Sequence, residues 1–317
     1  TPPRKNPITD PHLPRANRMP TGRAEQDVQK KEQEQSLRLK LVEIGRRLYE
    51  KGFIAGTDGN LSVRLGSHHM LTTPSGVHKG QLLPEQVLLC DLSGQPLGVP
   101  GNSKPSSEIR MHVLVYQARP DVSAAVHAHP PYSVALSLVG ISLAECLLPE
   151  AALALGPIPT APYATPTTED VPRSIKSLLT RRHNALILAR HGSLTLGDSL
   201  DQAYLRLETL EHTARITSIA RSMGGTTALP EEEVVRIESI ARELGIARPS
   251  PACSNCGACG LPAGSTGGSV TEHGRYMTAT PGPSSDEYTT VRRPPLPAEE
   301  IERIARIGED LATIRKK

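Results

Sequence analysis

Three histidines in the middle of the chain have the type and spacing needed to hold a divalent metal ion. His127 and His129 flank Ala128 in an apolar stretch that predicts a β-strand. Residues at i and i+2 of a strand project from the same face, so the two imidazoles are expected to converge. Neutral imidazoles suit Zn²⁺ and related divalent ions. The alternative for so short a motif is a polar strand end without a ligand.

His191 supplies a third imidazole. It ends a second apolar stretch and precedes Gly192, which lets the chain turn away from a ligand. Three protein ligands and one open position are typical of a catalytic zinc site. A histidine in this place is more often structural when taken alone, so the prediction depends on the whole set.

Glu108 follows two serines where a helix is expected to begin. Ser106, Ser107 and the free backbone N–H groups of a helix N-terminus can together bind an anion. Glu108 would then lie in the first turn, where a negative charge is tolerated. The alternative is a carboxylate that only caps the helix.

Two glycine-containing loops are further candidates for anion binding. One covers residues 56–62 and leads into a strand, and the other covers residues 72–76 and follows a strand. Backbone N–H groups and hydroxyls in such loops can bind phosphate, although ordinary turn chemistry explains either loop alone. Neither loop is a P-loop, because no Gly-Lys-Ser/Thr follows.

The elements that position these residues follow from apolar periodicity. Leu37, Leu41, Ile44 and Leu48 predict a helix, because they recur at three- and four-residue intervals. Further helices are expected from about residue 106, over 168–182 and over 199–223. Strands are expected over 61–65, 69–72, 87–91, 124–129, 185–189 and 193–196. We therefore predict an ordered α/β domain over residues 34–226, preceded by a disordered N-terminal arm over residues 1–33.

Composition excludes several classes of function. The 317-residue chain has a net charge of +3 with both signs interspersed, one Phe and no Trp. Neither a basic patch nor stacking aromatics for nucleic acid is therefore expected. No apolar run reaches the ~18 residues of a membrane span, and the N-terminal segment lacks the apolar core of a signal peptide. A cytoplasmic protein is the expectation.

The last third of the chain has a different composition. We predict an amphipathic helix over 227–248, a Cys/Gly/Pro-rich linker over 249–295 and a C-terminal amphipathic helix over 296–317. The linker carries Cys253, Cys256 and Cys259, which suit free thiols, a metal site completed elsewhere, or redox use. The apolar stripe of the last helix must pack on its own chain or on a partner.

The ordered set of motifs resembles the class II aldolase/adducin family, in particular its L-fuculose-1-phosphate aldolase-like enzymes. The resemblance covers about residues 34–226, and the motifs follow the family order. They are Gly56-Thr57-Asp58-Gly59-Asn60-Leu61-Ser62, Thr73-Pro74-Ser75-Gly76, Ser106-Ser107-Glu108, His127-Ala128-His129, Ala161-Pro162-Tyr163 and Arg190-His191-Gly192.

The resemblance implies a three-layer α/β/α sandwich around a mostly antiparallel sheet. It also implies a homotetramer with active sites at subunit interfaces and one Zn²⁺ or other divalent metal per subunit. The metal would be held by His127, His129 and His191, with Glu108 as catalytic acid/base and additional ligand. The residues implied for the substrate phosphate are Gly59, Asn60, Ser75, Gly76, Ser106 and Ser107.

The activity implied is aldol cleavage of a ketose 1-phosphate such as L-fuculose 1-phosphate to dihydroxyacetone phosphate and an aldehyde, in sugar catabolism. One departure matters: Leu148 occupies the place of the family's catalytic tyrosine. Glu150 is a candidate second acid/base, and it keeps a dehydratase of the methylthioribulose-1-phosphate type open. An epimerase and a non-enzymatic adducin-like binding module are further alternatives.

The predicted C-terminal helix adds an expectation about partners. Its layout behind a linker resembles the encapsulation peptides that tether enzymes inside a bacterial microcompartment, including some aldolase relatives. The helix over 296–317 is therefore expected to bind either such a shell or its own chain.

Overall fold

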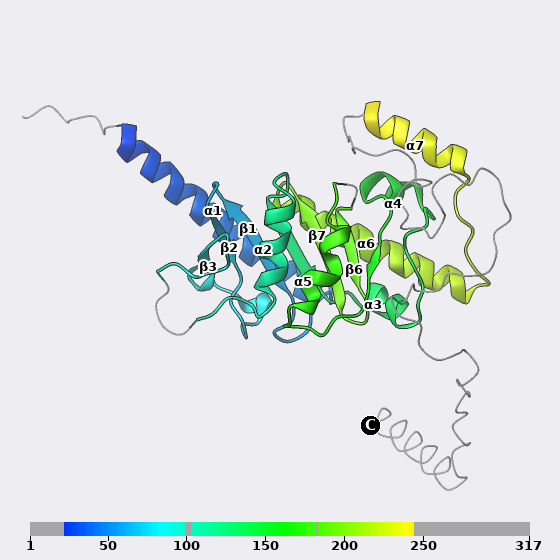
Figure 1. The fold of residues 1–317 in the computed structure, drawn as a ribbon, viewed down its shortest axis with the longest axis horizontal. Helices are drawn as coiled ribbons and strands as arrows, with labels where there is room; N and C mark the ends of the chain where they lie inside the picture. Colours follow the sequence, from blue (N-terminus) through cyan, green and yellow to red (C-terminus); the bar gives the residue numbers. More distant parts are fainter. Residues whose placement is uncertain (1–21, 99–102, 182, 244–317) are drawn as a thin grey trace, which may run out of the picture. The chain divides into compact units, whose positions relative to one another are not determined.

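A seven-stranded sheet forms the centre of the computed structural model, which describes residues 22–98, 103–181 and 183–243 (Figure 1). The strand order is β3-β2-β1-β4-β7-β6-β5. Every neighbouring pair is antiparallel except β5 and β6, which are parallel. This confirms the expected α/β class with a mostly antiparallel sheet. The strands are β1 (Asn60–Leu65), β2 (His69–Thr72), β3 (Leu88–Asp91), β4 (Ala124–Ala128), β5 (Thr160–Ala161), β6 (Ala185–Leu188) and β7 (Gly192–Gly197).

Helices cover both faces of this sheet. Alternating residues of β4 show the two sides: Val126 packs with α1 and the start of α6, and Ala125 packs with α2 and α5. The alternation follows from the two-residue period of a strand, and it produces three layers. The helices are α1 (Gly22–Glu50), α2 (Ile109–Ala118), α3 (Pro131–Leu138), α4 (Pro149–Ala154), α5 (Asp170–Ile175), α6 (Leu200–Ser222) and α7 (Glu231–Glu243).

Helix α1 begins earlier than the sequence pattern predicted. Residues 22–33 are helical, so the prediction of a disordered arm over 1–33 is wrong for this part. The segment consists mostly of Ala, Arg, Glu, Gln and Lys, which have high helix propensity, and no proline interrupts it. The helix therefore extends through residues 22–33 although this segment has no apolar stripe. Residues 1–21 lie outside the described part of the chain.

Helix α7 corresponds to the amphipathic helix predicted over 227–248, up to Glu243. It packs against α4, and the backbone N–H of Leu229 donates to the carbonyl of Cys146 at 2.9 Å. The linker over 249–295 with its three cysteines, and the predicted helix over 296–317, lie outside the described residues. Among the described helices, none is both long and apolar enough to cross a membrane.

Candidate metal centre

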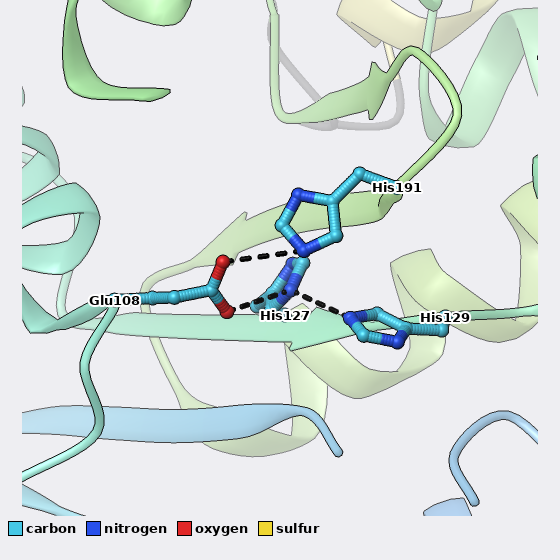
Figure 2. Close-up of side chains that lie close together, drawn as sticks. All are labelled: Glu108, His127, His129 and His191. Atoms are coloured by element: carbon cyan, nitrogen blue, oxygen red, sulfur yellow. Dashed lines mark hydrogen bonds and ion pairs between the residues drawn. The ribbon is translucent and has the colours of Figure 1, made fainter. Parts of the chain in front are cut away.

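Glu108 and the three histidines bring their ligand atoms together at one place (Figure 2), within 4.8 Å of one another. Two of the histidines come from β4 and the residue that follows it, His191 from the turn between β6 and β7, and Glu108 from the residue before α2. The Nε2 atom of His127 lies 3.1 Å from Nε2 of His129. Two ligands on one tetrahedral zinc ion, each at about 2.1 Å, are about 3.4 Å apart. The spacing therefore fits a shared ion.

The orientation of His127 is fixed from the neighbouring strand. Its ring is fully buried, and Nδ1 lies 2.8 Å from the backbone carbonyl of Ser193 on β7. A carbonyl oxygen can only accept, so Nδ1 must carry a proton, and in the neutral ring the lone pair is then on Nε2. This arrangement is typical of metal-binding histidines, whose second nitrogen donates to the protein.

Glu108 occupies the N-cap position of α2 but does not cap the helix with its side chain. The carboxylate turns to the histidines, with Oε2 3.1 Å from Nε2 of His127 and Oε1 3.2 Å from Nε2 of His191. Oε1 is buried and makes no correctly angled hydrogen bond within the described residues. Buried polar atoms normally have a partner, and a cation at this point would provide one. The predicted alternative of a plain capping carboxylate is therefore wrong.

The charges at this site also suit a cation. Burial alone raises the pKa of Glu108, but hydrogen bonds and charge from His127 and His191 outweigh it and hold the pKa well below its usual range. Burial lowers the pKa of His129 to about 4, with a further contribution from the neighbouring imidazoles. The site therefore favours an ionised Glu108 and a neutral His129, and carboxylate and imidazole groups are donors suited to Zn²⁺ or a related ion.

Gly192 leaves the space that two of these rings occupy. A Cβ at this position would lie 2.5 Å from the carbonyl oxygen of Ala128, 2.8 Å from Cδ2 of His129 and 3.0 Å from Cε1 of His127. Real Cβ atoms do not approach backbone oxygen so closely. The glycine is needed here for close approach rather than for an unusual backbone angle.

We expect Gly192→Ala to weaken zinc binding by at least about tenfold, a typical loss when the support of ligand histidines is disturbed. The added methyl group must displace either β4 or the two rings. Chelator competition on the full-length protein measures the loss. Gly52→Ala is the control, because Gly52 has a positive φ of 69° with open space around it. It should lower thermal stability and leave zinc affinity unchanged; equal affinities in both variants would contradict this role of Gly192.

The structure brings together two of the segments predicted to bind phosphate, the loop over 72–76 and the pair Ser106-Ser107. Pro74 and Pro105 form an isolated β-bridge, and the N–H of Ser75 donates to the carbonyl of Lys104 at 2.9 Å. Ser75, Gly76 and Ser107 are exposed, and Ser106 is half-buried. Exposed serines of both loops thus lie near one another. Their binding of a phosphate stays a prediction.

Gly59 and Asn60 have contacts that the sequence did not reveal. Gly59 has a φ of 70°, and a Cβ there would lie 2.9 Å from the carbonyl oxygen of His127. Asn60 is buried and pairs with His127 across the β1–β4 ladder. Its Nδ2 donates to Oε2 of Glu108 at 3.0 Å. Both residues therefore support the cluster, whether or not they also contact a phosphate.

Glu150, the candidate second acid/base, is exposed in the first turn of α4. Among the described residues, the carboxylates and imidazoles that gather at the metal centre do not include it. Leu148 is the N-cap residue of the same helix. Within one chain, the described residues therefore do not bring Glu150 into the cluster that contains Glu108.

The sequence pattern did not predict a buried polar network next to the site, formed by Ser62, His112 and Tyr116. His112 follows Glu108 by one turn of α2, and its Nδ1 lies 2.6 Å from the hydroxyl of Ser62. The same hydroxyl lies 2.7 Å from the hydroxyl of Tyr116. Burial lowers the pKa of His112 to about 3, so its ring stays neutral. The i,i+4 spacing of Glu108 and His112 was the available signal.

Glu211 on α6 holds the start of α3, two residues after His129. Its carboxylate accepts the N–H of Tyr132 at 2.7 Å, and the N–H and hydroxyl of Ser133 at 2.9 and 2.7 Å. We expect Glu211→Ala to destabilise the fold by about 1–3 kcal/mol, since buried donors lose their acceptor. Denaturant unfolding measures this, with the exposed Glu85→Ala as control. Equal stabilities of the two variants would show that the contacts contribute little.

An α/β domain with a glutamate and three histidines at one place defines a candidate metal-dependent enzyme. The Class II Aldolase and Adducin N-terminal domain family matches residues 39–218, more than half of the chain. The chain therefore belongs to the class II aldolase and adducin family, whose enzymes are metal-dependent lyases.

Relatives of known activity differ in their substrates. A 3-oxo-tetronate 4-phosphate decarboxylase of Pectobacterium atrosepticum is 32% identical over 190 residues, covering 59% of this chain and 85% of the relative. An L-fuculose phosphate aldolase of Methanococcus maripaludis is 31% identical over 185 residues, covering 58% and 98%. A solved L-fuculose 1-phosphate aldolase superposes with a TM-score of 0.60 at 30% identity, covering 65% of this chain and 96% of that one. The expected resemblance is confirmed.

Proposed function

We propose that this protein is a metal-dependent carbon–carbon lyase that cleaves a ketose 1-phosphate, such as L-fuculose 1-phosphate, to dihydroxyacetone phosphate and an aldehyde. The observation that carries the proposal is the ionised carboxylate of Glu108 facing the imidazoles of His127 and His191. Such an arrangement supports the proposal, because metal-assisted cleavage next to a carbonyl uses a proton-transfer group beside the metal.

The metal would be held by His127, His129 and His191, with Glu108 as a fourth ligand while substrate is absent. A bound divalent ion, Zn²⁺ in our proposal, supplies a Lewis acid that stabilises the negative charge left on the carbonyl fragment. Glu108 then transfers the proton to or from the carbon that carries this charge. Its partner Asn60 keeps Oε2 in place, while Oε1 faces Nε2 of His191 at 3.2 Å.

Binding of the substrate phosphate is assigned to the adjoining loops with Ser75, Gly76, Ser106 and Ser107. Their serine hydroxyls, with backbone N–H groups of the same loops, could form several hydrogen bonds to one anion. Binding energy from the phosphate, which does not react, fixes the geometry at the reacting carbons.

Decarboxylation is a second candidate, and Leu148 favours it. Aldol cleavage must remove the hydroxyl proton of the departing aldehyde, which leucine cannot do. Loss of CO₂ from a 3-oxo acid needs no such proton transfer: the bond to the carboxylate breaks and its electron pair forms the enediolate. The carbon then takes up one proton, which solvent supplies through Glu108. If the family's homotetramer forms here, a partner subunit can supply the group that removes this hydroxyl proton. Aldol cleavage is therefore still the first candidate.

The remaining alternatives have weaker support. All four residues of the candidate metal centre are present, which argues against a binding module without a metal. A dehydratase needs a second acid/base. Within a single chain Glu150 does not supply it, because Glu150 is exposed and lies outside the cluster. An epimerase would use the same metal and phosphate residues, so only its product distinguishes it.

Product analysis tests the proposal. The full-length zinc-loaded protein is incubated separately with L-fuculose 1-phosphate, 3-oxo-tetronate 4-phosphate, ribulose 5-phosphate and methylthioribulose 1-phosphate. We expect dihydroxyacetone phosphate and an aldehyde from the first. Dihydroxyacetone phosphate and CO₂ from the second alone would establish the decarboxylase instead. Turnover of only the third or fourth compound would reject a carbon–carbon lyase.

A further inference from the structure

The turn over residues 56–59 lies directly beside one of the candidate ligands. Oδ2 of Asp58 is 3.4 Å from Nδ1 of His129, and Nε2 of the same ring is 3.1 Å from Nε2 of His127. The two nitrogens of His129 therefore have different surroundings, with a carboxylate beside Nδ1 and the metal centre beside Nε2.

A buried lysine, Lys79, contacts the backbone of this turn. Lys79 lies in the 3₁₀ turn Lys79–Gln81, is only 2% exposed, and donates from Nζ to the backbone carbonyl of Thr57. Burial lowers the pKa of Lys79, and the charges of Asp58 and Glu108 act in the opposite direction. A buried ammonium group is costly to leave without partners, so this contact is not readily given up.

The surroundings leave the lysine and the turn little freedom to move. A Cβ on Gly45 of α1 would lie 2.8 Å from the backbone oxygen of Lys79, so helix and 3₁₀ turn are in close contact. The N–H of Asp58 donates to the carbonyl of Ala55 at 3.0 Å, and Gly59 packs on the backbone of His127. The turn is thus held at both ends and by Lys79 between them.

We propose that Asp58 and Lys79 are positioning residues for the metal centre. Asp58 accepts a hydrogen bond from Nδ1–H of His129, which keeps the lone pair of Nε2 directed at the metal, and Lys79 fixes the turn that carries Asp58. Carboxylate–histidine–metal arrangements of this kind orient the ring and raise its basicity. The inference rests on the proposed metal site but not on the identity of the sugar.

Zinc affinity tests the inference independently of turnover. Chelator competition is measured on the full-length protein and on Asp58→Ala, Asp58→Asn, Lys79→Met and the double Asp58→Ala/Lys79→Met variant. The controls are Asp201→Ala and Lys40→Met, which remove the same charges from an exposed pair with an Nζ–Oδ1 distance of 3.1 Å. Visible spectra of the Co²⁺-loaded forms report ligand geometry, and thermal unfolding of the metal-free forms reports folding.

We expect Asp58→Ala to weaken zinc binding by about 10–100-fold, the typical effect of losing such a partner, and to change the Co²⁺ spectrum. Asp58→Asn should recover part of the affinity, because its amide oxygen still accepts a hydrogen bond from Nδ1–H of His129. Lys79→Met should also weaken binding, and the double variant should be no weaker than Asp58→Ala, since Lys79 acts through Asp58. Both controls should bind zinc like the unmodified protein.

Other outcomes overturn the inference. If the unmodified protein binds zinc tightly and Asp58→Ala binds it equally well with the same Co²⁺ spectrum, Asp58 has no positioning role and the metal site stands. Additive losses in the double variant would overturn the action of Lys79 through Asp58. Absence of zinc binding in the unmodified, folded protein would reject the metal site and its support together.

Discussion

Replacing His127 and His129 together with alanine should remove stoichiometric metal from the protein and abolish turnover. The two Nε2 atoms are 3.1 Å apart and face the same point, and only one imidazole would remain. A single imidazole and a carboxylate do not provide the three protein ligands of a catalytic zinc site. The fold should survive, because substitution to alanine keeps the backbone pairing of β4 with β1 and β7.

Elemental analysis of purified protein and a turnover assay measure this effect. His68→Ala/His69→Ala is a matched control, since it removes two neighbouring histidines that are exposed and lie outside the cluster. We expect it to keep one metal per chain and full activity. A metal content near one per chain in the His127→Ala/His129→Ala variant would refute the site.

Glu108→Gln should lower turnover by about 10²–10⁴-fold, the usual range for losing a general acid/base, with near-normal substrate binding. Glutamine keeps the shape of the side chain. It can still contact Asn60, whose amide donates to Oε2 of Glu108 in the unmodified protein. It cannot accept and return a proton at carbon. Because the pKa of Glu108 is held well below its usual range, the unmodified residue is ionised at neutral pH. In that form it can accept the proton from carbon in the reverse, aldol-forming direction, and it returns a proton to carbon during cleavage.

Steady-state kinetics on the substrate identified by product analysis give kcat and KM separately. The exposed Glu85→Gln serves as control and should behave like the unmodified enzyme. A large rise in KM with unchanged kcat would assign Glu108 to binding instead. Turnover equal to that of the control would exclude Glu108 as the acid/base.

Local pattern was enough to find most of the elements and the residues of the candidate metal centre. The two-residue period of a strand places His127 and His129 on one face whatever the rest of the chain does. Three- and four-residue spacing predicted the part of α1 that packs on the sheet, where Leu41 and Leu48 are fully buried. The same criterion failed for residues 22–33, because helix propensity without an apolar stripe was enough there.

The sequence by itself therefore determined which residue types were available and which strand or loop carried each of them. Only the tertiary structure decided their contacts. His191 reaches His127 because β7 pairs with β4 and the β6–β7 turn ends beside it, and that register also gives His127 the carbonyl of Ser193. Asp58 lies beside His129, and Lys79 donates a hydrogen bond to the turn that carries Asp58. Such contacts depend on pairing and burial between distant segments, which no local periodicity records.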